Sequence, residues 1–93
     1  MTTEKKVEIM LLAYKSPQRY ALRRAVVAAC EELEVCFPGL NVEVKDVKKR
    51  QEIETYTPVV IYPSLVLNGT LVCTGRFPRK DEIIGWLHQV LDD

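Results

Sequence analysis

The chain has few of the residues from which common catalytic and metal sites are built. Its 93 residues include one histidine and three cysteines, and none of them follows a C-x-x-C or H-x-x-x-H spacing. We therefore predict no metal site, because zinc sites in proteins draw their ligands from such closely spaced pairs. The chain has four glycines, and they do not form a glycine-rich phosphate-binding motif. Its single histidine allows at most one Ser-His-Asp triad, and the sequence shows no pattern typical of one. We assign no catalytic residue and no cofactor.

An excess of charge and a long apolar run are also missing. Thirteen basic and thirteen acidic side chains cancel, so the composition gives no indication of nucleic acid as a partner. The apolar stretch from Val7 to Tyr14 is too short to cross a membrane and wrongly flanked for a signal peptide. Three cysteines without close pairing do not make a disulfide framework. We expect a cytoplasmic protein with no membrane partner.

The residues that are present suffice for one small core. Apolar residues make up 47% and charged residues 28% of the chain, as is typical of a globular protein, and the length corresponds to a single domain over residues 1–93. The apolar periodicity predicts the order β-α-β-α-β-β-α. Strands are expected at residues 6–14, 41–47, 65–67 and 70–74, with 59–61 leading into the third strand, and helices at 16–35, at 48–56 and from 81 onward.

The connections between these elements define an α/β fold. The first two strands are expected to be parallel and joined by a right-handed helical crossover. Asn68-Gly69 is typical of a two-residue hairpin turn, so the last two strands should be antiparallel to each other. The result is a four-stranded mixed sheet flanked by helices. At the start of the first helix, Ser16 is predicted to act as the N-cap and Pro17 to occupy the first turn.

The stretch from Tyr62 to Gly69, Tyr-Pro-Ser-Leu-Val-Leu-Asn-Gly, resembles the thioredoxin superfamily. In that family a cis-proline followed by Thr or Ser leads into an apolar strand and an Asn-Gly or Asp-Gly turn. Asp46-Val47 and Gly75 fit the same pattern, and the resemblance extends from Val7 to Leu91. The best match is to the small archaeal and bacterial thioredoxin-like proteins of under a hundred residues. The resemblance implies a thioredoxin-like fold with a cis bond before Pro63.

The resemblance places the redox Cys-x-x-Cys of that family on Ser16-Pro17-Gln18-Arg19, where both cysteines are absent. In the family the positive end of the helix dipole lowers the pKa of the first thiol and makes it a nucleophile. A serine hydroxyl at this place stays protonated near neutral pH and cannot exchange with a disulfide. The scaffold and its peptide-facing groove are therefore expected without the dithiol activity, and whether the protein is an enzyme is left open.

Charge placement on the first helix points to the same groove. Lys15, Arg19 and two further arginines lie near the helix start, against the preference of the helix dipole. Free backbone N–H groups beside arginines can bind an anion, although a solvated surface is the simpler explanation of exposed charge. We predict that the groove binds a protein or peptide partner, or a small anionic, glutathione-like ligand. Its residues are Lys15, Ser16, Pro17, Gln18, Arg19, Tyr62, Pro63, Gly75 and Arg76.

Three other interpretations stay open. A thiol–disulfide oxidoreductase or electron carrier would work through Cys30, Cys36 or Cys73, although isolated cysteines are usually small buried hydrophobic residues. A bridge between the first two of these requires the helix to end between them. Ser16 also resembles the hydroxyl that binds the glutathione sulfur in glutathione transferases. Finally, the clock protein KaiB is similar in having a thioredoxin-like state without the cysteine pair, which suggests a protein-interaction module.

Overall fold

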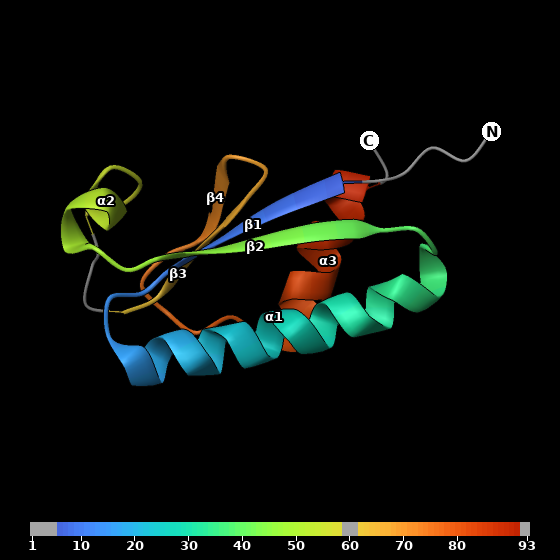
Figure 1. The fold of residues 1–93 in the computed structure, drawn as a ribbon, viewed down its shortest axis with the longest axis horizontal. Coiled ribbons are helices and arrows are strands. Elements are labelled where there is room, and N and C mark those ends of the chain that lie inside the picture. Colours follow the sequence, from blue (N-terminus) through green and yellow to red (C-terminus); the bar gives the residue numbers. More distant parts are fainter. Residues whose placement is uncertain (1–5, 59–61, 92–93) are drawn as a thin grey trace.

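The computed structural model describes residues 6–58 and 62–91 (Figure 1). Its elements are β1 (Lys6–Leu12), α1 (Ser16–Cys36), β2 (Asn41–Val47), α2 (Arg50–Glu54), β3 (Ser64–Leu67), β4 (Thr70–Cys73) and α3 (Lys80–Leu91). The predicted element order is confirmed. Residues 59–61, which were expected to lead into the third strand, lie outside the described residues.

The strands form one mixed sheet in the order β2-β1-β3-β4. Strand β2 runs parallel to β1, whereas β3 is antiparallel to both β1 and β4. The hairpin between β3 and β4 turns at Asn68 and Gly69, whose φ angles of 48° and 82° are left-handed, as a type I′ turn requires. The Asn68 side chain also accepts a hydrogen bond of 2.8 Å from the Glu8 N–H, so the turn residue ties the hairpin to the neighbouring strand.

Helices cover both faces of the sheet (Figure 1). On one face, β1 places Val7, Ile9 and Leu11 in a core shared with α1 and α3. On the other face, Leu12 packs in a smaller cluster with Ile53 of α2. Because successive side chains of a strand point to opposite faces, the near-continuous apolar sequence of β1 is what a strand covered on both sides needs.

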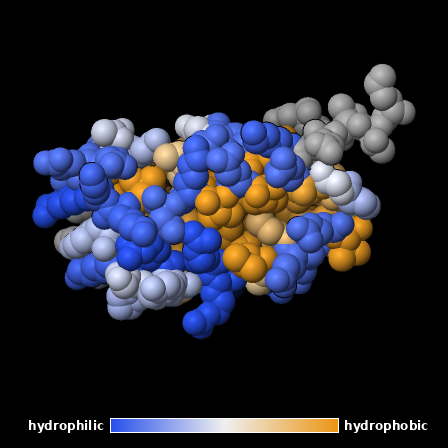
Figure 2. Space-filling model, in the orientation of Figure 1, coloured by the Kyte–Doolittle hydropathy of each residue, from blue (hydrophilic) through white to orange (hydrophobic). Residues whose placement is uncertain are grey.

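The two long helices bury one stripe each. The buried residues of α1 are Leu22, Val26, Ala29 and Leu33, and those of α3 are Ile83, Leu87 and Leu91. Both sets recur at helical spacing, as predicted from the sequence. Polar side chains cover much of the face drawn in Figure 2, but an apolar area is open to solvent between β2 and α1. Among the helices of the described residues, none has the combined length and apolar character needed to cross a membrane.

Two valines of α1 provide a matched test of this core. Val26 is 0% exposed and Val35 is 81% exposed, so the same substitution removes buried methyl groups in one case and solvated ones in the other. We expect Val26→Ala to lower the free energy of unfolding by about 2–3 kcal/mol. Val35→Ala should leave it unchanged or raise it by a few tenths of a kcal/mol, since alanine favours helix more than valine does. Urea unfolding measures both values, and equal losses would contradict the observed orientation of α1.

Candidate functional site

Three segments of the chain meet where β1 ends. The register of β1 with β3 pairs Leu12 with Ser64, so Pro63 follows opposite Ala13, the residue after β1. The Arg76 N–H donates a hydrogen bond of 3.2 Å to the Pro63 carbonyl. The structure thus brings the β1–α1 loop, the start of β3 and the loop after β4 together, and we call this place the junction. It is where the sequence placed its candidate groove.

The N-cap of α1 lies one residue earlier than expected. Lys15 is the N-cap in extended backbone, Ser16 is the first helical residue, and no side chain caps the helix. The first helical hydrogen bond runs from the Arg19 N–H to the Lys15 carbonyl, 3.0 Å away. The prediction that Ser16 caps the helix was therefore wrong, because the helix incorporates this residue instead. Pro17 does lie in the first turn, where its missing N–H leaves no helical bond unmade.

Arg19 folds back onto the loop that precedes its own helix. One guanidinium nitrogen donates to the Ala13 carbonyl at 3.0 Å and to the Tyr14 carbonyl at 3.5 Å. The other nitrogen donates to the Ser16 hydroxyl at 3.1 Å. These two carbonyls follow the end of β1 and have no described strand beside them to donate a hydrogen bond, so the Arg19 side chain satisfies them. Arg19 therefore holds the loop in place, and its donors are directed at the protein itself.

Arg76 is paired as well. Its guanidinium makes two hydrogen bonds to the Glu82 carboxylate, at 2.9 and 2.7 Å, and the Arg79 N–H adds a third at 3.0 Å. The hydrogen bonds from Arg76, followed by that from the Arg79 backbone, lower the pKa of Glu82 to about 2. The carboxylate lies in the first turn of α3, where it also satisfies a free N–H of the helix start. The sequence analysis missed Glu82, although acidic residues favour this position.

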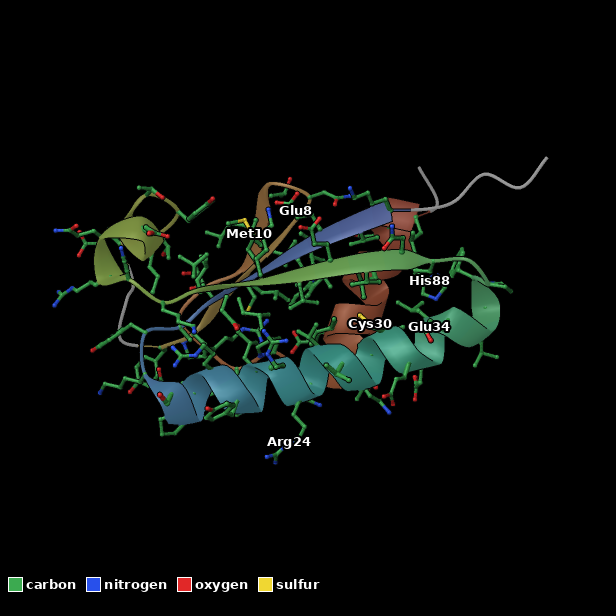
Figure 3. All side chains as sticks on the ribbon, viewed as in Figure 1. Glu8, Met10, Arg24, Cys30, Glu34 and His88 are labelled. Carbon is green, nitrogen blue, oxygen red and sulfur yellow. The ribbon has the colours of Figure 1, made fainter. Side chains whose placement is uncertain are left out.

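The other basic residues of the helix start differ in their surroundings. Arg23 donates to the Asp46 carboxylate of β2 at 2.6 Å, and the Lys15 ammonium lies 5.8 Å from the centre of the Tyr14 ring. Arg24 points away from the sheet into solvent (Figure 3). In the described part of the chain, the charges of Arg23 and Arg76 are thus neutralised by carboxylates, whereas Arg24 stays solvated.

The expected cis bond before Pro63 was wrong. None of the peptide bonds among the described residues is cis, so Tyr62 and Pro63 are joined by a trans bond. Trans is the lower-energy form of an X-Pro bond by about 0.5–1 kcal/mol, and in this form the buried Pro63 carbonyl reaches the Arg76 N–H. Pro63 has no N–H of its own and its carbonyl accepts the Arg76 N–H, so this residue offers no unpaired backbone group to an added strand.

Hydroxyl groups connect the segments on the other side of Pro63. The Ser64 hydroxyl donates to Thr74 Oγ1 at 3.0 Å and accepts a hydrogen bond of 3.3 Å from the Gly75 N–H. The hydroxyls of Thr57 and Thr74 lie 2.7 Å apart. Ser64 and Thr57 are buried, so these bonds satisfy polar groups that would otherwise be costly there. The sequence offered a signal only for Ser64, through its place after the proline.

Exposed aromatic rings lie directly beside the junction residues. Tyr62 precedes Pro63 and is 53% exposed, and Phe77 follows Arg76 and is 45% exposed. Tyr20 follows Arg19 and is 65% exposed. In addition, the Gln18 amide oxygen in the first turn of α1 is shielded from solvent and has no hydrogen-bond partner in the described part of the chain. The junction therefore combines apolar rings with an acceptor that lacks a donor.

The three cysteines are free thiols, and none lies in the first turn of α1. Cys30 is grouped with Glu34 and His88 in the half of the molecule away from that turn (Figure 3). Helix α1 continues through Cys36. Cys36 lies six positions after Cys30, a rise of about 9 Å along the helix, which is too far for a disulfide.

The local environment does not activate the two shielded thiols. Burial raises the pKa of the Cys30 thiol, and the nearby Glu34 carboxylate raises it further. Burial also raises the pKa of Cys73, with the Arg76 charge opposing the shift. A thiol whose pKa is raised carries little thiolate at neutral pH. Among the described residues, no group of histidine, cysteine and acidic side chains could hold a metal ion.

Comparison with known protein families places the chain in a described family. The profile of a family described as the thioredoxin domain matches residues 6–88. The matched range contains every strand, helices α1 and α2, most of α3, and all residues of the junction. Neither the search of curated proteins nor the search of solved structures gave a match.

The Arg76–Glu82 pair can be tested by titration. Because the pKa of Glu82 is lowered to about 2 from an ordinary value of 4.5, the pair stabilises the fold above the ordinary value, and this stabilisation is lost as the pH falls through the lowered one. We expect the NMR signal of the Glu82 carboxyl carbon to titrate near pH 2. In Arg76→Ala the midpoint should rise toward 4.5. As the pH falls from the ordinary to the lowered pKa, the free energy of unfolding should decrease less for Glu82→Gln than for the wild type. A wild-type midpoint near 4.5 would contradict the pairing.

Proposed function

The chain belongs to the thioredoxin domain family, and on this basis we propose that it is a member without redox dithiol chemistry that binds an extended peptide segment of a partner protein at the junction. One combined observation carries the proposal. The rings of Tyr62 and Phe77 are exposed, whereas the basic side chains of Arg19 and Arg76 already bind other groups of the same protein.

The residues of the first helical turn argue against disulfide exchange. Ser16 and Arg19 occupy that turn, and neither side chain can form a bond to sulfur in an exchange reaction. The thiols of Cys30 and Cys73, whose pKa values are raised by burial, are protonated at neutral pH and are poor nucleophiles. Free thiols throughout fit the reducing cytoplasm that the sequence analysis expected.

A peptide fits the junction better than a small anion does. Arg76 is held in two hydrogen bonds by Glu82, and Arg19 is directed at backbone carbonyls, so an anion would have to compete with existing partners. Tyrosine and phenylalanine rings on a surface are typical of the centres of protein interfaces.

Affinity selection tests the peptide site. Peptides selected from a random displayed library on the wild-type protein are expected to shift the NMR signals of the junction residues. Tyr62→Ala and Phe77→Ala should each weaken a selected peptide by about tenfold or more, because exposed rings at an interface centre contribute most of the affinity. The matched control is Tyr56→Ala, an exposed tyrosine beyond α2 whose hydroxyl meets Met10, and it should leave the affinity within about twofold.

Two outcomes would contradict this proposal. One is that peptide affinity survives the loss of both Tyr62 and Phe77. The other is that glutathione or phosphate binds the wild-type protein and that this binding disappears in the Arg19→Ala/Arg76→Ala double variant, because the junction would then be an anion site. Raising the salt concentration should weaken anion binding strongly and peptide binding only slightly.

Insulin reduction tests the loss of dithiol chemistry. With dithiothreitol as reductant, we expect the wild-type protein to leave the rate at its uncatalysed value. The Ser16→Cys/Arg19→Cys variant restores two thiols to the first turn of α1, where the helix dipole lowers the pKa of the first one, and it should accelerate the reaction. Turnover by the wild-type protein that disappears in Cys73→Ser, Cys30→Ser or Cys36→Ser would instead identify an oxidoreductase.

A further inference from the structure

Strand β2 forms one edge of the sheet, and among the described residues no strand pairs with its outer side. The Ala13 N–H donates to the Val47 carbonyl at 3.2 Å, so the backbone polar groups of Val47 face β1. Because these groups alternate sides along a strand in a parallel pair, the N–H and C=O groups of Val42, Val44 and Asp46 point outward. An edge of this kind is a template for a further strand.

The side chains of β2 point alternately to the two faces of the sheet. Asp46 pairs with Arg23 of α1, and Val42 and Val44 pack against the core that α1 and α3 share. Glu43 and Lys45 therefore lie on the opposite face, where both are exposed. Their charged groups are 3.6 Å apart. The edge thus carries one negative and one positive side chain placed symmetrically about Val44.

We propose that β2 pairs with β2 of a second copy of this chain, antiparallel and about a two-fold axis through Val44. In this register Val44 lies opposite Val44 of the second copy, and Val42 lies opposite Asp46, so every outward-facing residue meets another outward-facing residue. Glu43 then lies opposite Lys45 of the second copy in a non-hydrogen-bonded pair, where opposed side chains are closest. The two-fold axis repeats this ion pair.

The charges select this register over its neighbours. A shift that centres the pairing on Glu43 places two glutamates opposite each other, and a shift that centres it on Lys45 does the same with two lysines. Like charges directly opposite one another destabilise a pair of strands, whereas opposite charges stabilise it. Charged side chains usually protect an edge strand from pairing, but here they complement themselves.

The surface beside this edge is suited to burial. In Figure 1, β2 lies in front of β1 and α3, and the space-filling view of the same side has an apolar area between β2 and α1 (Figure 2). Val42, Val44 and Cys30 are only partly buried, and Val27 of α1 is exposed. The two-fold axis places both α1 helices on the same face of one continuous sheet, with these apolar side chains near the contact.

Charge exchange at two positions tests the interface. Sedimentation velocity of the full chain should detect a wild-type dimer. Glu43→Lys and Lys45→Glu should each raise the dimer dissociation constant about tenfold or more, because each turns two attractive pairs into repulsive ones. An equimolar mixture of these two variants should form a heterodimer, since all its cross-strand pairs are then opposite in charge. Native mass spectrometry distinguishes this heterodimer from either homodimer by mass.

Two further variants complete the design. The Glu43→Lys/Lys45→Glu double variant restores complementary charges and should dimerise as the wild type does. Glu31→Lys makes an equal charge change at an exposed position of α1 and should leave the dimer unchanged, and circular dichroism verifies that every variant folds. A wild-type monomer at the highest concentration reached, single variants that dimerise like the wild type, or a mixture that fails to form heterodimer would each overturn the proposal.

Discussion

The burial of β1 on both faces is the constraint on which the rest of the structure depends. Its odd-numbered side chains fill the core beneath α1 and α3, and Leu12 fills the cluster beneath α2. With both faces covered, β1 can present only its two edges, which pair with β2 and β3. Where β1 ends at Leu12, its carbonyl groups lose their strand partners and the chain must turn into α1. The junction lies at this point because the strand that organises the sheet ends there.

Arginine at position 19 solves a local problem that the end of β1 creates. The carbonyls of Ala13 and Tyr14 need donors, and the Arg19 guanidinium supplies them from the first turn of α1. A cysteine at this position could not do so, because its thiol is a weak hydrogen-bond donor on a short side chain. The Arg19 guanidinium therefore makes the loop before α1 more rigid, as the proposed peptide site requires. The Arg76–Glu82 pair has a similar effect on the loop before α3.

The sequence predicted the fold more completely than the site. Periodicity located the two long helices because each buries a regular set of apolar residues, such as Leu22, Val26, Ala29 and Leu33 of α1. The hairpin was located instead by its Asn68-Gly69 turn. The family pattern predicted that Ser16, Pro63 and Gly75 share one groove. The structure shows that Leu12 at the end of β1 lies opposite Ser64 and that the Gly75 N–H bonds to the Ser64 hydroxyl. What the sequence did not predict were partners distant along the chain. The pairing of Arg23 with Asp46 spans 23 residues and that of Thr57 with Thr74 spans 17. These contacts depend on register and loop geometry, which composition and spacing do not encode.

Asp46 lies on the edge proposed for dimerisation and also contacts α1, the helix that begins at the junction. It belongs to the edge strand β2, yet one carboxylate oxygen binds Arg23 in the first half of α1, and the other oxygen is shielded from solvent without a partner in the described part of the chain. A second copy paired along β2 would place its Val42 beside this carboxylate and exclude more water from the ion pair. Electrostatic attraction strengthens as water is excluded, so pairing at the edge would hold the first half of α1 more firmly. In the proposed dimer, one carboxylate would therefore contact both the paired edge and the first half of α1.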